Sequence, residues 1–385
     1  MDYFLTDDQI MIRDLTRTLA EEKIRPVRAQ LDENEEFPTE IIKEIGRADL
    51  FSVFIPKEYG GFGGGCLDLV IVVEELSRVC AGVALSYAAS ILGLYPLMLF
   101  GSDEQKQKYL PRIVEGKTLA AFALTEPDAG SDAGGIKTTA KLCNDEYVLN
   151  GTKQWITNGG EADIYTVIAM TDKKRGSRGA SAFVVEKGTP GFDFGKKEKK
   201  MGIRASATRE LIFNNCIIPK SNIIKKEGMG FLVAMKTLDR SRPGIGAQAL
   251  GIAQGAMEEA LSYAKDRVQF NQPISSFQAI QHMLADMGTQ IEAARSLIYS
   301  VSRYIDGGAQ DISKVAAMSK VFASDTAMKV TTDAVQIMGG YGYMKDYPLE
   351  KMMRDAKITQ IYEGTNQIQR NVIALNMIKE NARKR

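Results

Sequence analysis

The chain has 385 residues, of which 44% are apolar and 25% charged, and its formal net charge is +1. This length predicts two or three domains of an ordinary globular protein, and the balanced charge excludes nucleic acid or an acidic membrane surface as the main partner. The only histidine, His282, cannot supply a multi-histidine metal site, and no nucleophile lies near it in the sequence. Proton transfer would therefore fall to a carboxylate, a lysine or a tyrosine.

No targeting or membrane-spanning segment is evident. The acidic start MDYFLTDDQ lacks the pattern of a signal or transit peptide, and no run of about eighteen apolar residues predicts a membrane span. The four cysteines are far apart and form no C-x-x-C pair, so we predict no metal site and no disulfide framework. We expect a cytoplasmic protein, although a processed organelle form would have the same sequence features.

Residues 1–119 are predicted to form a helical domain. Thr6 is placed to cap a first helix, in which Ile10, Leu15 and Leu19 recur at helical spacing before Pro26. The segment 67–101 is apolar all round, which is typical of a buried core helix. The glycine-rich EYGGFGGGC has no strand before it and no Lys-Ser or Lys-Thr after it, so we interpret it as a helix connection rather than a phosphate-binding loop.

Residues 120–228 are predicted to form a β domain, and residues 229–385 are predicted to be helical. Asn150-Gly151 lies between apolar segments and predicts a hairpin turn, while the runs 162–172, 180–188 and 209–219 predict strands of a small barrel or sandwich. Farther on, apolar residues from Phe277 to Val301 advance by three or four, as in a bundle helix. Because strands and helices do not alternate, a Rossmann fold is disfavoured.

Three polar clusters are candidates for a site between the β domain and the rear helices: LTEPDAGSD (124–132), WITNGG (155–160) and IYEGTNQIQR (361–370). Trp155, the only tryptophan, is suited to packing on a planar cofactor or to filling a core. Glu363 lies beside Tyr362 and two isoleucines, which would desolvate it and raise its pKa toward that of a useful base. Gly364 leaves room beside it for a ligand. A solvated glutamate at a helix end is the competing interpretation.

These clusters, together with MGIRAS, AVQIMGGYGY and MRDAKITQIYEGTNQIQ, resemble the acyl-CoA dehydrogenase family in order and spacing along the whole chain. The resemblance implies an α+β multidomain fold with an N-terminal helical domain (1–119), a middle β-barrel (120–228) and a C-terminal four-helix bundle (229–385). It also implies a homotetramer with FAD between subunits. One departure is Asn271, where many relatives have glycine, so the resemblance does not predict the conformation of this loop, although it still implies the cofactor.

The resemblance also assigns roles to individual residues. Glu363 matches the family's base, which removes the α-proton of an acyl-CoA thioester while a hydride leaves to the flavin; Ser241 stands where some members carry their base instead, and serine cannot do that work. The matched flavin contacts are Phe122, Leu124, Thr125, Trp155 and Thr157, with Thr365 and Gln367 near the adenosine part, and Arg267, Phe270, Gln336 and Gly340 reaching FAD from a neighbouring subunit. The matched CoA contacts are Ser131, Asp239 and Arg242, although an internal salt bridge is the competing interpretation for Arg242.

The acyl group is harder to predict. In relatives the acyl tail lies against the helix that corresponds to GVALSYAASILGLYP, which here carries Tyr87 and Tyr95. We expect these tyrosines, with Tyr362 and Gly364, to border the substrate. Val83 stands where glutaryl-CoA dehydrogenases use an arginine, so a dicarboxylic substrate is disfavoured. The segments MKTLDRSRPGIGAQALGIAQG and MGIRASATREL resemble the short-chain, butyryl-CoA branch most, although branched, cyclic or aromatic acyl groups stay open.

The expected activity is therefore FAD-dependent α,β-dehydrogenation of a short-chain acyl-CoA, with electron-transferring flavoprotein as the partner that takes the electrons. The first alternative is an enoyl-CoA reductase, which would use the same residues in the opposite direction. The second is a non-catalytic CoA or flavin binder, which the presence of Glu363 and of every matched flavin position disfavours. An oxygen-using oxidase is disfavoured because such relatives are much longer.

Overall fold

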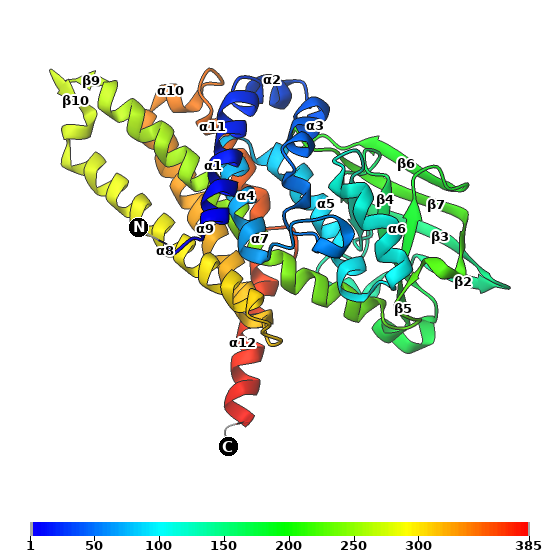
Figure 1. Ribbon diagram of the computed structural model, residues 1–385. Coiled ribbons are helices and arrows are strands. Elements are labelled where there is room, and N and C mark those ends of the chain that lie inside the picture. Colours follow the sequence, from blue (N-terminus) through cyan, green and yellow to red (C-terminus); the bar gives the residue numbers. More distant parts are fainter. Residues whose placement is uncertain (1–2, 384–385) are drawn as a thin grey trace.

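The computed structural model describes residues 3–383, and its three parts follow one another along the chain as helices, strands and helices (Figure 1). This order of helical, β and helical parts agrees with the α+β multidomain fold expected from the sequence. The first part contains α1 (Asp7–Leu19), α2 (Arg28–Glu33), α3 (Thr39–Arg47), α4 (Cys66–Val79), α5 (Ala81–Phe100) and α6 (Asp103–Val114).

Local signals explain the first helix. Thr6 accepts a hydrogen bond from the Gln9 N–H, and the Thr6 N–H donates in return to the Gln9 side-chain oxygen, so that α1 begins with a complete capping box. The N-cap predicted at Thr6 is thus confirmed. The helix continues through a π-helical turn over Ala20–Ile24, and Pro26 lies in the turn that follows.

Helix α5 is the core element of this part. Among the described residues it is the one helix long and apolar enough to cross a membrane by length and composition. However, 72% of its apolar window is buried inside the protein, where the helix packs against β1 and α7. The predicted core helix is therefore confirmed, and it supplies one wall against which the β domain folds.

The middle part is an eight-stranded sheet, at the right of Figure 1. Its strands are β1 (Ala120–Ala123), β2 (Thr139–Cys143), β3 (Glu146–Thr157), β4 (Ile164–Met170), β5 (Ala180–Glu186), β6 (Phe192–Lys197), β7 (Thr208–Pro219) and β8 (Ile223–Ile224). They are ordered β6-β7-β3-β2-β4-β5-β8, and β1 pairs in parallel with β4. The long strand β3 ends at Thr157, so the sheet delivers Trp155 and Thr157 to its junction with the helices.

The hairpin predicted at Asn150-Gly151 is wrong. Both residues lie inside β3, and the turn between β2 and β3 is Asn144-Asp145, where Asn144 has a φ of 55°. Gly151 marks a bulge, since the register of β3 against β7 shifts between Leu149 and Gly151. A Cβ on Gly151 would lie 2.7 Å from the Thr138 Cα, so glycine is needed here for close packing rather than for a turn.

The rear part is a helical bundle built around α7. Its helices are α7 (Gly230–Asp266), α8 (Gln278–Asp306), α9 (Ser313–Met338), α10 (Gly340–Tyr343), α11 (Leu349–Thr359) and α12 (Asn366–Arg383), with a small hairpin of β9 (Val268–Gln269) and β10 (Gln272–Pro273) at one tip. Helix α7 packs on α4, α5, α8 and α9, and it thus joins the two helical parts. Helix α12 extends away from the body (Figure 1).

Candidate active site

A cavity of about 590 Å³ lies where the β domain meets the rear bundle. It takes residues from the loop after β1, from the end of β3, from the loop 198–203, and from the turn between α11 and α12. Eight of the residues singled out in the sequence line it together: Thr125, Ser131, Trp155, Thr157, Tyr362, Glu363, Gly364 and Thr365. The three polar clusters therefore meet in one place, as their order predicted.

Glu363 occupies a constrained turn between α11 and α12. Its φ is 50°, in the left-handed region that non-glycine residues rarely adopt, and Gly364 follows with a φ of 91°. The side-chain amide of Gln369 donates to the backbone carbonyls of Glu363 and Gly364. The buried Lys320 on α9 donates to the Gly364 carbonyl at 2.9 Å and to the Asn366 side chain at 2.8 Å. The backbone that carries Glu363 is thus fixed from two directions.

The surroundings of the Glu363 side chain favour a base rather than a solvated carboxylate. Burial raises its pKa above the ordinary value, and three groups oppose this shift: a hydrogen bond from Ser241 and the positive charges of Arg242 and Lys320. Burial also lowers the pKa of Lys320 to about 7. The competing interpretation of a solvated helix-end glutamate is therefore contradicted, because protein surrounds this group except where it faces the cavity.

Tyr362 supports the same turn from the side of α7. Its hydroxyl donates to the Gln248 side-chain oxygen, and the Gln248 amide donates to the Ala81 carbonyl at the start of α5. Burial raises the pKa of Tyr362 well above its usual range, so that the ring stays neutral. A chain of contacts thus links the turn to the N-terminal helices.

Trp155 forms part of the opposite wall. It is 60% exposed and has a φ of 56°, so the interpretation of Trp155 as a core residue is contradicted. The following turn is anchored by Asn158, whose buried amide donates to the Ser86 carbonyl, the Ser90 hydroxyl and the Ala120 carbonyl. The indole therefore lies open to the cavity on a backbone held against α5.

A buried ion pair that sequence reasoning missed supports the loop after β1. The Lys153 ammonium lies 2.7 Å from Glu126 and donates to the Leu124 carbonyl at 2.9 Å. Glu126 also accepts the backbone N–H groups of Lys137 and Thr138. The signal in the sequence is a lysine, Lys153, at an inward-facing position of β3, together with Glu126 in the nearby LTEPDAGSD cluster.

Several predicted residues do not line the cavity, and their roles stay predictions. Tyr87 is fully buried and donates to the Leu50 carbonyl, and Tyr95 is also buried. Arg242 forms a buried ion pair with Asp239 at 2.7 Å, which is the competing interpretation considered for it. Phe122 in β1 is half-buried and Leu124, directly after β1, is buried, and neither lines the cavity.

A second hollow of about 430 Å³ adjoins the cavity and shares Lys357, Ile361 and Thr365 with it. Gln367, predicted near the adenosine part of a cofactor, lines this hollow together with Asn366 and Arg370. Thr365 accepts the Ile368 N–H and so begins α12. Thr125, Trp155 and Thr157 of the predicted flavin-ring contacts thus line a cavity that adjoins the predicted adenosine contacts Thr365 and Gln367.

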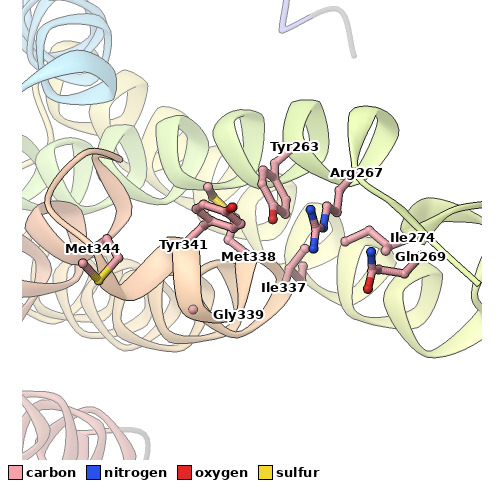
Figure 2. A pocket seen from close by; sticks show the side chains of 10 residues that line it. Tyr263, Arg267, Gln269, Ile274, Ile337, Met338, Gly339, Tyr341 and Met344 are labelled. Carbon is pink, nitrogen blue, oxygen red and sulfur yellow. The ribbon is translucent and has the colours of Figure 1, made fainter.

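The predicted contacts from a neighbouring subunit lie elsewhere. Figure 2 shows Arg267 and Tyr341 in a pocket of about 450 Å³ that Gly340 also lines, with the guanidinium 5.7 Å from the centre of the Tyr341 ring. Phe270 and Gln336 are exposed near this end of α7 and α9. Along α7, roughly 37 Å separate Arg242 from Arg267 at 1.5 Å per residue. Arg267 and Gly340 therefore lie in a different pocket of the protomer from Thr125, Trp155 and Thr157.

The departure at Asn271 has a local explanation. Phe270 and Asn271 join β9 to β10, and their φ angles are 50° and 62°. Two positive φ angles are typical of the tight type I′ hairpin turn, and asparagine tolerates this region better than other non-glycine residues. Asn271 therefore maintains the turn that glycine would otherwise make.

Comparison with known proteins covers almost the whole chain. Family models match in three consecutive parts: acyl-CoA dehydrogenase N-terminal domain at residues 6–117, middle domain at 121–216 and C-terminal domain at 228–378. The short-chain specific acyl-CoA dehydrogenase of Clostridium acetobutylicum is 50% identical over 97% of this chain and 99% of that protein. The acryloyl-CoA reductase (NADH) of Anaerotignum propionicum is 48% identical over 98% of this chain and 96% of that protein.

Two solved structures agree closely with the fold. Butyryl-CoA dehydrogenase from Megasphaera elsdenii shares 47% identity with a TM-score of 0.96, covering 98% of this chain and 100% of that one. A chain solved in work on the electron transferring flavoprotein of Acidaminococcus fermentans shares 52% identity with a TM-score of 0.96, covering 98% and 99%. The chain belongs to the acyl-CoA dehydrogenase family.

Proposed function

We propose that the protein binds FAD and dehydrogenates a short-chain acyl-CoA at its α,β-carbon bond, with Glu363 as the base. The observation that carries this proposal is the half-buried carboxylate of Glu363, whose pKa is raised by desolvation and which lines one cavity together with an exposed indole. Relatives named as short-chain specific acyl-CoA dehydrogenase and butyryl-CoA dehydrogenase support the choice of substrate class. The absence of an arginine at Val83, which is buried, supports an acyl chain without a distal carboxylate.

The residues of the cavity fit the α-proton abstraction. An α-proton of a thioester is weakly acidic, so the developing charge on the thioester oxygen needs a fixed donor. In the described part of the chain the Glu363 N–H donates to no protein acceptor, which leaves it available for that oxygen. Glu363 then takes the proton from C2, and the dry surroundings that raise its pKa make it a stronger base.

The same cavity fits a flavin. Trp155 offers an exposed aromatic face, Thr125 and Thr157 offer hydroxyls at its edge, and the adjoining hollow with Thr365 and Gln367 continues the surface. When bound, FAD would accept the hydride that leaves C3 of the acyl chain. Arg267, Phe270, Gln336 and Gly340 of a second copy would complete its site, which supports an oligomer, and the family resemblance extends this proposal to a homotetramer.

The test of the base is Glu363→Gln, which keeps the shape of the side chain and removes its basicity. We expect purified protein to be yellow and to retain FAD, while anaerobic bleaching of the flavin by butyryl-CoA falls by about 10³-fold or more. Glu40→Gln, which removes an exposed carboxylate on α3 that lines neither the cavity nor the adjoining hollow, serves as a control. Unchanged bleaching in Glu363→Gln would refute the proposal.

The substrate is tested by anaerobic titration of the wild-type protein with linear, branched and cyclic acyl-CoAs. We expect complete bleaching with butyryl-CoA and weak bleaching with long-chain thioesters. Preference for a branched or aromatic acyl group would contradict the short-chain assignment while leaving Glu363 as the base.

A second candidate function is reduction of a short enoyl-CoA, which the similarity to acryloyl-CoA reductase favours. The residues would be the same, so the flavin potential with and without ligand distinguishes the two directions. We further propose an electron-transferring flavoprotein as the electron partner, supported by the similarity to a chain studied with such a protein. The cytoplasmic location stays a prediction.

A further inference from the structure

Ser241 on α7 lies directly against the proposed base. Its hydroxyl oxygen is 2.5 Å from Oε2 of Glu363 and 3.2 Å from the carbonyl oxygen of Leu238, one helical turn earlier. A serine hydroxyl has one proton to donate, so it serves one of these two acceptors at a time. Oε2 of Glu363 accepts the hydrogen bond from Ser241, whereas Oε1 accepts no hydrogen bond from the described residues.

This arrangement distinguishes the two carboxylate oxygens. With Oε2 bonded to Ser241, the carboxylate is held in one orientation and Oε1 is left for the substrate. A hydrogen bond to an ionised acceptor is stronger than one to a neutral acceptor. The bond from Ser241 therefore favours the ionised form of Glu363, and its hold weakens once Glu363 takes up a proton.

We propose that Ser241 is a positioning residue that selects Oε1 of Glu363 as the proton-accepting oxygen and changes its hydrogen-bond acceptor during turnover. The proposal rests on the function proposed for Glu363. When the C2–H bond breaks and the Oε1–H bond forms, Oε2 loses its negative charge, and the Ser241 O–H turns toward the Leu238 carbonyl. No proton passes between Ser241 and Glu363, so the serine keeps its own proton throughout.

Other charged or titratable groups face Glu363 and must be separated from this effect. Arg242 on α7 and Lys320 on α9 are cations that favour the carboxylate. Tyr95 on α5 and the adjacent Tyr362 lie within electrostatic reach, and burial raises the pKa of both tyrosines far enough to keep them neutral. Because burial lowers the pKa of Lys320 to about 7, a pH profile alone could report Lys320 instead of Glu363.

The experiment therefore observes the carboxyl group itself. Difference infrared spectroscopy of the full-length flavoprotein without substrate would follow the protonated carboxyl band of Glu363, identified by its loss in Glu363→Gln. In Ser241→Ala, which retains a good helix former in α7, we expect the titration midpoint to rise by about one pH unit, because a hydrogen bond that favours the ionised form is lost. Lys320 has no such band and does not contribute.

Kinetics give the second readout. At a pH above both midpoints, Ser241→Ala should reduce kcat for flavin reduction by butyryl-CoA several-fold with little change in KM, because the carboxylate is free to rotate. Ser241→Thr keeps the hydroxyl and should restore the wild-type midpoint. Ser319→Ala is the matched control: Ser319 is a buried serine that donates to the Ala316 carbonyl at 2.9 Å on α9 and does not touch Glu363.

The outcomes separate this proposal from the function on which it rests. An unchanged midpoint in Ser241→Ala, or an equal rise in Ser319→Ala, would overturn the role of Ser241 while leaving Glu363→Gln inactive. Full flavin reduction in Glu363→Gln would instead remove the proposed function, and the infrared titration would still report whether Ser241 bonds to Glu363.

Discussion

The two pockets that hold the predicted cofactor residues differ in how completely a single protomer builds them. Around Glu363, the turn is fixed by Lys320 and Gln369 and the facing wall by Asn158, all of them buried. At the far end of α7 (Figure 2) the surface is open: Phe270 is 89% exposed and Tyr343 80% exposed. The first region is held by these buried contacts within the chain although its indole Trp155 is 60% exposed, whereas the second region presents Phe270 and Tyr343 to solvent.

This difference indicates that the two regions have different roles. Proton abstraction needs groups fixed to within a fraction of an ångström, and contacts within one protomer supply that order. Exposed aromatic residues around a pocket are typical of a surface that another molecule covers. We infer that the first region carries the chemistry of its own protomer and that the second completes the cofactor site of a neighbour.

Complementation between subunits tests this division most strongly. Glu363→Gln alone should lose about 10³-fold or more of the activity, and Arg267→Glu alone should lose FAD. If each site takes Glu363 from one copy and Arg267 from another, random mixing of the two variants during refolding restores about a quarter of the sites. Turnover with butyryl-CoA after mixing measures this recovery.

The control mixes Glu363→Gln with Ser241→Ala, two changes in the same region. Because Glu363 and Ser241 belong to the same protomer, each site in that mixture should carry either the Glu363→Gln or the Ser241→Ala change. No site should therefore be more active than a site of Ser241→Ala. Absence of recovery with Arg267→Glu, in a mixture that forms hybrid oligomers and takes up FAD, would contradict a shared site.

Acid should disable the first region while leaving the second intact. Since the pKa of Glu363 is raised by burial, the base becomes protonated at a pH above the ordinary range for glutamate. We expect kcat/KM to fall about tenfold per pH unit below that pKa, while sedimentation shows an unchanged oligomer over the same range. An acid limb at the ordinary glutamate value would indicate that Glu363 is not desolvated.

Lys320→Met should destabilise the first region in a pH-dependent way. Removal of the ammonium leaves the Gly364 carbonyl and the Asn366 side chain without their partner, at a cost of about 1–3 kcal/mol in the free energy of unfolding. The folded pKa of Lys320, about 7, lies below that of an unfolded lysine. The unfolded chain therefore binds more protons above this pH, and stability rises with pH.

In Lys320→Met this contribution to the rise should vanish. Urea unfolding at fixed protein concentration, at pH 7 and pH 9, compares the variant with the wild type. The comparison is necessary because burial also lowers the pKa of Lys153 and of Lys200 to about 8, and these lysines add to the slope in both proteins. Equal slopes would show that Lys320 does not titrate in the folded protein.

The smallest effects are expected at the open pocket, in the turn at Asn271. With a φ of 62°, Asn271→Gly should change the free energy of unfolding by less than about 1 kcal/mol. Asn271→Val places a branched side chain in the left-handed region and should cost about 1–2 kcal/mol. Thermal unfolding and FAD retention measure both variants, and equal behaviour of the two would contradict the type I′ turn.

The sequence predicted the fold class and the meeting of three clusters because these depend on apolar periodicity and on long motifs. The capping box at Thr6 and the core helix α5 follow from local patterns that act over a few residues. The hairpin at Asn150-Gly151 failed because the same dipeptide serves in a bulge when a neighbouring strand approaches closely.

The supports of the site were beyond prediction for a different reason. Lys320 lies far from Glu363 in the sequence, and only the packing of α9 under the turn brings them together. Likewise, Ser241 could be judged as unable to act as a base, but its contact with Glu363 depends on the path of α7. Such pairs of distant polar groups carry no periodic signal.

The backbone of Glu363 has a consequence for the evolution of the protein. A left-handed φ at a glutamate costs about 1–2 kcal/mol, which a glycine at this position would release. An inactive Glu363→Gly molecule should then withstand heating better than the working one. Selection for heat resistance alone would therefore favour loss of the reaction. A search for more stable variants has to select for thermal stability and for activity at the same time.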